Sequence, residues 1–115
     1  MVTSAGLMPA RFIIHTVGPI WSDGSKDERK LLANAYRNCI KLATDLKLKS
    51  IAFPNISTGI YSFPKEEAAD IALTEIVKFS KNNRGIEKII FCCYDDENYD
   101  IYINKINQII NAFDK

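Results

Sequence analysis

Three short apolar runs, each followed by a longer segment with helical periodicity, constrain the fold of this chain more than any other feature. The runs are Arg11–Val17, Ser50–Ile56 and Glu87–Tyr94. Each run is apolar at odd and even positions alike, which is typical of strands that are covered on both faces. Alternation of such strands with helices favours parallel pairing through right-handed crossovers. The sequence therefore predicts an α/β sandwich with a mainly parallel sheet, in which a strand followed by a helix occurs three times.

Each apolar run is followed by apolar residues spaced three and four positions apart, as on one face of a helix. This spacing predicts helices from Asp27 to Leu46, from Pro64 to just before Asn82, and from about Asn98 to Phe113. Ser25 and Glu28 are three residues apart, so they are expected to form a capping box at the start of the first helix.

Length, charge and cysteine content exclude several classes of protein. The 115 residues fit one domain, and no apolar run reaches the roughly eighteen residues of a membrane helix. The net charge of +1 is too small for the electrostatic attraction by which proteins bind nucleic acid without sequence preference. The cysteines, Cys39, Cys92 and Cys93, are odd in number and lack a zinc spacing, which argues against disulfides and metal. Because disulfides are not expected, we expect a cytoplasmic location.

The loop after the second run is the most informative candidate site, because ligands of open parallel sheets bind beyond the carboxyl ends of the strands. It contains the hydroxyl residues Ser57 and Thr58, followed by Gly59, just before the helix expected at Pro64. A glycine permits a left-handed backbone, and successive N–H groups can then form a nest for an anion. The helix N-terminus adds positive potential. A strand-to-helix turn without a ligand explains the same residues equally well.

The remaining candidates have simpler structural explanations. His15, the only histidine, fits a buried core residue better than a catalytic base. Cys92 and Cys93 fit small core residues better than nucleophiles. The acidic residues at positions 95–97 could bind a cation, although caps and first-turn acids of the third helix explain them more simply. Tyr94 could stack on a base or close the core. From the residues alone, the chain is an anion- or nucleotide-binding α/β domain.

Three segments carry a more specific resemblance: TSAGLMPARFIIHTVGPIW, ERKLLANAYRNCIKLA and SIAFPNISTGIYSFPKEEAADIAL. With these segments the sequence resembles the macro domain family. It is most similar to the branch whose members hydrolyse ADP-ribose derivatives and mono-ADP-ribosylated proteins. The resemblance extends from Val2 to about Phe113 and implies a three-layer α/β/α macro-like fold.

The resemblance also implies roles for individual residues. In the family, the loop after the middle strand holds the diphosphate of ADP-ribose with backbone N–H groups, and its aromatic residue packs on the distal ribose. An aromatic residue near the end of the domain lies against the adenine. The positions concerned in this sequence are Ser57, Thr58, Gly59, Ile60, Tyr61 and Tyr94. No catalytic residue, metal ligand or cofactor is assigned within the chain, and His15 is not a catalytic residue of the family.

The sequence departs from the family in one respect. Macro domains of this branch begin well before the TSAG segment, and their first part includes an Asn-Ala-Ala-Asn stretch and a glycine-rich loop with the catalytic aspartate. Neither motif occurs in this sequence. Residues 1–115 are therefore expected to form a single, partial macro domain that binds ADP-ribose or a derivative. The alternatives are a non-catalytic remnant or interaction domain, and the back half of a split hydrolase. Whether the chain is an enzyme stays open.

The expected partners follow from this departure. They are ADP-ribose or a derivative, and either a second copy of the chain or a complementing N-terminal macro fragment, with no nucleic acid and no membrane. In the family, a strand of the first part separates the strands matching Arg11–Val17 and Ser50–Ile56. Because unpaired strand edges are costly, we expect that this gap does not persist in an isolated monomer. Either the two strands pair directly or a second chain fills the slot.

Overall fold

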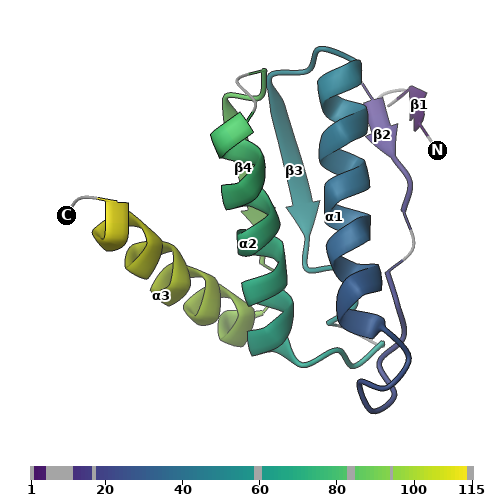
Figure 1. Cartoon of the computed structure of the whole chain (residues 1–115), viewed down its shortest axis with the longest axis vertical. Helices are drawn as coiled ribbons and strands as arrows, with labels where there is room; N and C mark the ends of the chain where they lie inside the picture. The colour runs from purple at the N-terminus through teal and green to yellow at the C-terminus, as the bar shows by residue number, and fades with distance from the viewer. Residues whose placement is uncertain are drawn as a thin grey trace.

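A computed structural model of the chain describes residues 2–4, 12–16, 18–58, 61–82, 85–93 and 95–113. Strands and helices alternate as the sequence predicts, with one additional strand near the N-terminus (Figure 1). The elements are β1 (Val2–Ser4), β2 (Phe12–Ile14), α1 (Glu28–Asp45), β3 (Ser50–Pro54), α2 (Lys65–Asn82), β4 (Lys88–Cys92) and α3 (Asp96–Phe113). The α/β class and the three strand–helix units are confirmed. None of the helices within these ranges is long and apolar enough to cross a bilayer.

The strands form two separate two-stranded sheets. β1 runs antiparallel to β2, whereas β3 and β4 are parallel, with Ser50 opposite Lys88 and Pro54 opposite Cys92. Among the described residues, no hydrogen-bonded ladder joins β2 to β3. The structure therefore does not show the direct pairing of these two strands, which was one of the two outcomes expected for the gap. The other expected outcome, a second chain in the slot, remains a prediction.

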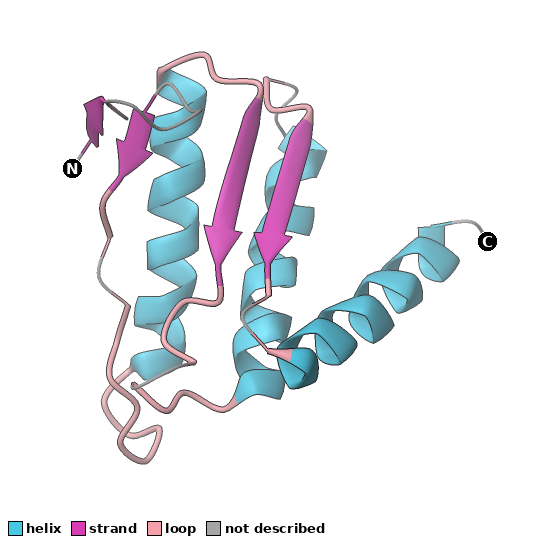
Figure 2. Cartoon of the chain, turned by 180° about the vertical axis from the view of Figure 1, so that it is seen from behind, coloured by secondary structure: helices cyan, strands magenta, loops and turns pink. Residues whose placement is uncertain are grey.

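Helices α1 and α2 lie on one face of β3 and β4, and the opposite face is open to view in Figure 2. Exposure alternates along both strands as a result: Ile51 and Phe53 are packed, whereas Ala52 is exposed. Coverage of these strands on both faces was therefore a wrong expectation for the described residues. Side chains of a strand point alternately to its two faces, and an apolar run alone does not say which polypeptide covers each face.

The core lies between the helices and the covered face of β3 and β4. An aromatic row crosses it: Tyr36 of α1 is 5.1 Å from Phe53 of β3, and Phe91 of β4 is 4.8 Å from Tyr102 of α3, between ring centroids. Ala72 of α2 is fully buried, and its small side chain lets the helix backbone approach the core closely. The core thus joins all three helices to the parallel pair.

The first helix begins where the sequence predicts, but its start has a different geometry. The N-cap residue of α1 is Asp27 rather than Ser25, and the Ser25 hydroxyl donates to the Asp23 carboxylate, so the expected capping box is not formed. Asp27, the residue before α1, has a left-handed backbone with φ of 59° and makes no side-chain cap. This turn directs Glu28 back toward the preceding loop, where its carboxylate accepts hydrogen bonds from main-chain N–H groups.

Two expectations about buried residues are wrong. His15 is exposed, because β2 ends at Ile14 and is shorter than the apolar run that suggested it. Cys92 is also exposed, because it belongs to the set of alternate β4 residues on the uncovered face. Cys93, half-buried, packs against the core, and Cys39 is buried as part of it.

Candidate functional site

The candidate site lies at the edge of the sheet where β3 and β4 both end, which is the lower edge in Figure 2. The segment after β3 leads to α2, and the segment after β4 leads to α3. Both loops open at one edge because the strands are parallel, as the sequence predicts. The segment that precedes α1 runs to the same edge (Figure 1).

The loop after β3 is closed by its own backbone. The N–H of Phe63 donates to the carbonyl of Ser57 at 2.9 Å, and the hydroxyl of Thr58 donates to the carbonyl of Asn55 at 3.3 Å. Ser57 and Ser62 both have left-handed backbones, with φ of 66° and 61°. Two residues in this conformation curve the chain tightly between the strand and the helix.

The side chain of Ser57 points into the protein. Its hydroxyl oxygen is buried and has no hydrogen-bond partner among the described residues. It lies so close to Gly18 that a β carbon at that position would be 2.2 Å from it. The Thr58 hydroxyl is bonded to the Asn55 carbonyl, so the hydroxyls of Ser57 and Thr58 both lie against the protein. Main-chain N–H groups are therefore the candidates in this part of the loop for binding an anion.

A second loop, residues 18–24, is fixed against the first. The N–H of Trp21 donates to the carbonyl of Tyr61 at 2.9 Å, and the Trp21 ring packs on Phe63 with 4.9 Å between centroids. The Arg29 guanidinium lies 5.1 Å from the centre of the Trp21 ring and pairs with Glu67 in the first turn of α2. The two loops therefore form one unit that is held by the starts of α1 and α2.

Glu28 organises the segment that leads from this second loop into α1. Its carboxylate accepts hydrogen bonds from the N–H groups of Ser22, Gly24 and Lys26, at 3.0, 2.9 and 2.6 Å. The residue is only 1% exposed. The hydrogen bond from Ser22, helped by those from Gly24 and Lys26, outweighs desolvation and lowers the pKa of Glu28 to about 2. A charged Glu28 is thus part of the folded loop.

The acidic residues after β4 stabilise the start of α3. Asp95 accepts the N–H of Asn98 at 2.8 Å, which is a helix cap, and this bond is the main reason that the pKa of Asp95 is lowered. Lys65, at the start of α2, pairs with Asp95 at 3.0 Å and with Glu97 at 2.9 Å. The cap-and-first-turn interpretation is confirmed. Within the described ranges, no group of acidic, histidine and cysteine side chains could hold a metal ion.

The structure brings only part of the predicted site into view. Ser57, Thr58 and Tyr61 lie on one loop, as the sequence predicts. The remaining predicted positions, Gly59, Ile60 and Tyr94, lie outside the described residues. Sequence reasoning missed the role of Glu28, because the spacing to Ser25 suggested a cap instead.

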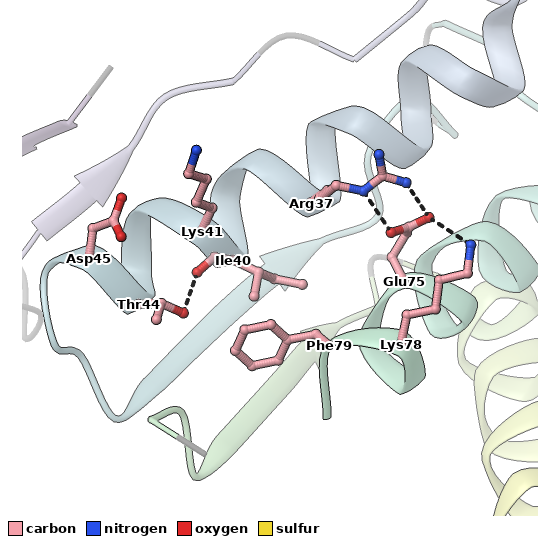
Figure 3. Close-up of a pocket in the computed structure, with 8 residues that line it drawn as sticks. All are labelled: Arg37, Ile40, Lys41, Thr44, Asp45, Glu75, Lys78 and Phe79. Atoms are coloured by element: carbon pink, nitrogen blue, oxygen red, sulfur yellow. Dashed lines mark hydrogen bonds and ion pairs between the residues drawn. The ribbon is translucent and has the colours of Figure 1, made fainter. Parts of the chain in front are cut away.

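A groove between α1 and α2 lies at the opposite end of these helices (Figure 3). It has a volume of about 540 Å³, and its lining includes Ile40 and Phe79. Glu75 is its most buried charged group, and Arg37 binds both of its oxygens at 3.0 and 3.2 Å. Lys78 lies 3.8 Å from the same carboxylate. The charges of Arg37, Glu75 and Lys78 therefore satisfy one another.

Comparisons with known proteins agree with this geometry. The family model described as Macro domain matches residues 1–72. The chain is 51% identical to O-acetyl-ADP-ribose deacetylase 1 from Pantoea vagans over 93% of its own length and 63% of that relative. It is 49% identical to a macro domain-containing protein from Methanosarcina mazei over 84% of the chain and 51% of that protein. The chain thus spans less than two thirds of these curated relatives.

Solved structures are similar as well. The macrodomain of Oceanobacillus iheyensis with ADP shares 43% identity and a TM-score of 0.90 over 97% of this chain and 58% of that one. The macrodomain of Trypanosoma brucei in complex with ADP-ribose shares 31% identity and a TM-score of 0.82 over 91% of this chain and 44% of that one.

Proposed function

The chain belongs to the macro domain family, and we propose that it binds ADP-ribose or an ADP-ribose derivative at the loop between β3 and α2. The observation that carries this proposal is the similarity to the O. iheyensis macrodomain, which contains ADP and superposes over 97% of this chain with a TM-score of 0.90. A macrodomain in complex with ADP-ribose and relatives named O-acetyl-ADP-ribose deacetylase support the same ligand class.

In this proposal, main-chain N–H groups of residues 57–61 hold the diphosphate. The inward orientation of the Ser57 and Thr58 hydroxyls supports a main-chain role for this loop. The start of α2, at Lys65, adds the positive end of a helix near the loop. The ammonium group of Lys65 is already paired with Asp95 and Glu97, so the attraction for phosphate comes from amide dipoles rather than from this cation. Tyr61 packs on the distal ribose, and Tyr94 lies against the adenine.

Hydrolysis is the second candidate function, favoured by 51% identity to a protein named as a deacetylase. The resemblance places the catalytic aspartate in a glycine-rich loop, which does not occur in these 115 residues. We therefore propose that these residues supply ligand binding, and that hydrolysis requires polypeptide from outside them. A cytoplasmic location remains a prediction from the cysteine content.

Isothermal titration of the 115-residue chain with ADP-ribose tests the binding proposal. We expect a Kd of about 100 μM or weaker, because the chain spans only 63% of the deacetylase to which it was compared. ADP and ribose 5-phosphate serve as partial ligands, and both should bind more weakly than ADP-ribose. If ADP-ribose at millimolar concentration produced no heat and protected no residue of the loop, the chain would instead be an interaction domain.

A further inference from the structure

Ile20 lies at the edge of the sheet that carries the candidate site, on the loop before α1 that extends below this edge in Figure 1. It is 66% exposed, which makes it the most exposed large apolar side chain in the described part of the chain. Its neighbour Trp21 is only partly exposed, because the indole ring packs on Phe63 and against the core. Trp21 thus closes the protein at this edge, whereas Ile20 faces solvent.

The loop that carries Ile20 is held from several sides. The Glu28 carboxylate accepts the main-chain N–H of Ser22, two residues after Ile20, at 3.0 Å. The Arg29 guanidinium lies 5.1 Å from the centre of the Trp21 ring, on the next residue of the loop. These contacts hold the backbone on the C-terminal side of Ile20, so the exposed side chain is presented from an anchored segment. Contact of this apolar side chain with water is unfavourable, and a partner that covers it is favoured.

A main-chain hydrogen bond places Ile20 beside the loop after β3. The N–H of Trp21 donates to the carbonyl of Tyr61 at 2.9 Å. That N–H belongs to the peptide group that joins Ile20 to Trp21, so Ile20 and Tyr61 are close in space although far apart in the sequence. In the function proposed above, Tyr61 packs on the distal ribose of ADP-ribose. Ile20 is therefore next to the end of the ligand at which the distal ribose lies.

The distal ribose is the part of ADP-ribose that is joined to other groups. In a mono-ADP-ribosylated protein this ribose is linked to an amino-acid side chain, and in O-acetyl-ADP-ribose one of its hydroxyls carries the acetyl ester. The acetyl group is small and ends close to the ribose, whereas a polypeptide extends past the site on both sides of the modified residue. A largely exposed side chain on a loop beside the site fits the polypeptide better than the acetyl group.

We propose that Ile20 is a specificity-determining residue, which contacts an apolar side chain next to the modified residue of a mono-ADP-ribosylated polypeptide. The contact removes apolar surface of both side chains from water and so favours polypeptides with an apolar neighbour at this position. The inference rests on the proposed binding of ADP-ribose at the loop between β3 and α2, and it adds the class of substrate and a sequence preference to that proposal.

Two synthetic peptides, each with ADP-ribose on one central serine, test the inference. One peptide has leucine on both sides of the modified serine, and the other has unmodified serine there. Isothermal titration of the 115-residue chain should show about five-fold tighter binding of the leucine peptide, as expected for partial burial of an apolar side chain. Equal affinities would overturn the inference and leave the binding of ADP-ribose intact. No binding of free ADP-ribose would overturn the proposed function, and the inference with it.

Matched variants of the chain locate the contact. Ile20→Ser should abolish the preference for the leucine peptide, whereas the conservative Ile20→Leu should keep it. Ile110→Ser removes a 50% exposed apolar side chain in the last turns of α3, away from the site, and should also keep the preference. Circular dichroism checks that each variant folds, and Ile20→Thr replaces Ile20→Ser if the serine variant does not. A preference that persists without the apolar side chain at position 20 would overturn the inference.

O-acetyl-ADP-ribose distinguishes a contact with the polypeptide from a contact with the acyl group. Ile20→Ser should bind O-acetyl-ADP-ribose and free ADP-ribose as the parent chain does, because neither ligand extends beyond the distal ribose far enough to cover Ile20. A loss of affinity for O-acetyl-ADP-ribose as large as the loss for the leucine peptide would assign the contact to the acyl group, and this result would also overturn the inference.

Discussion

A β carbon on Gly18 would lie 2.2 Å from the hydroxyl oxygen of Ser57 and 2.5 Å from a methyl carbon of Ile56. Gly18→Ala should therefore displace the loop after β3 and destabilise the fold by about 1–3 kcal/mol, as overpacking of a close contact does. Urea unfolding measures the loss. In a Ser57→Ala background the loss should be smaller, because one of the two contacts is then gone. A Gly18→Ala variant as stable as the parent would contradict the geometry of this contact.

Glu28 should make stability depend on pH in the acid range. Its pKa in the folded chain is about 2, against an ordinary value of 4.5, so its contribution is fully present above pH 4.5 and is lost as the pH falls toward 2. The difference in melting temperature between the parent and Glu28→Gln should be large at pH 7 and shrink across this window. Glu87→Gln, an exposed glutamate of another loop, is the control and should change the melting temperature little at any pH. A difference in melting temperature between the parent and Glu28→Gln that stays constant with pH would contradict this prediction.

Gly59→Glu should weaken ADP-ribose about ten-fold or more, since it places a carboxylate where the diphosphate is proposed to lie. Thr74→Glu adds the same charge at an exposed position of α2 and should leave the affinity unchanged. Calorimetric titration compares the two variants. Equal affinities would show that the loop assignment is wrong.

Tyr94→Ala should weaken ADP-ribose and ADP about five-fold or more, because stacking of an aromatic ring on a base contributes about 1–3 kcal/mol. Ribose 5-phosphate, which has no base, should bind this variant and the parent alike. If all three ligands lost affinity equally, the residue would act through the fold rather than through the adenine.

The 115-residue chain alone should not hydrolyse O-acetyl-ADP-ribose, because nothing in its sequence matches the loop that positions water in the family. Chromatography of the products over several hours measures this. Turnover that is lost when a residue of this chain is altered would refute the prediction.

The helices could be predicted from the sequence, whereas the lengths of the strands and the segments that cover their faces could not. The expected helix from Asp27 to Leu46 differs from α1 by one residue at each end, because its apolar residues face a core formed by the chain itself. The run Arg11–Val17 contains a strand of three residues, Phe12–Ile14. An apolar run indicates that its side chains can be buried. It does not indicate which polypeptide covers them, because that depends on the assembled fold.

The site was predictable where it depends on topology. Parallel strands bring the loops after β3 and β4 to one edge, which the order of elements already implies. The contact between Trp21 and Tyr61 could not be foreseen, since it joins two loops 40 residues apart (61 minus 21) through backbone atoms that carry no sequence signal. The same holds for Glu28, whose orientation follows from the left-handed Asp27.

Two ion pairs, Arg29–Glu67 and Arg37–Glu75, each join residues 38 positions apart. They are spaced eight residues along both helices (37 minus 29 and 75 minus 67), which is about 12 Å or slightly more than two turns. Because the pairs occur in the same order along both helices, α1 and α2 are parallel and are joined at two levels. Neither helix can slide along the other by a single turn without breaking both pairs together. The pairs therefore fix the N-terminal end of α1 beside the N-terminal end of α2, and with them the relative positions of the two loops that lead into these helices.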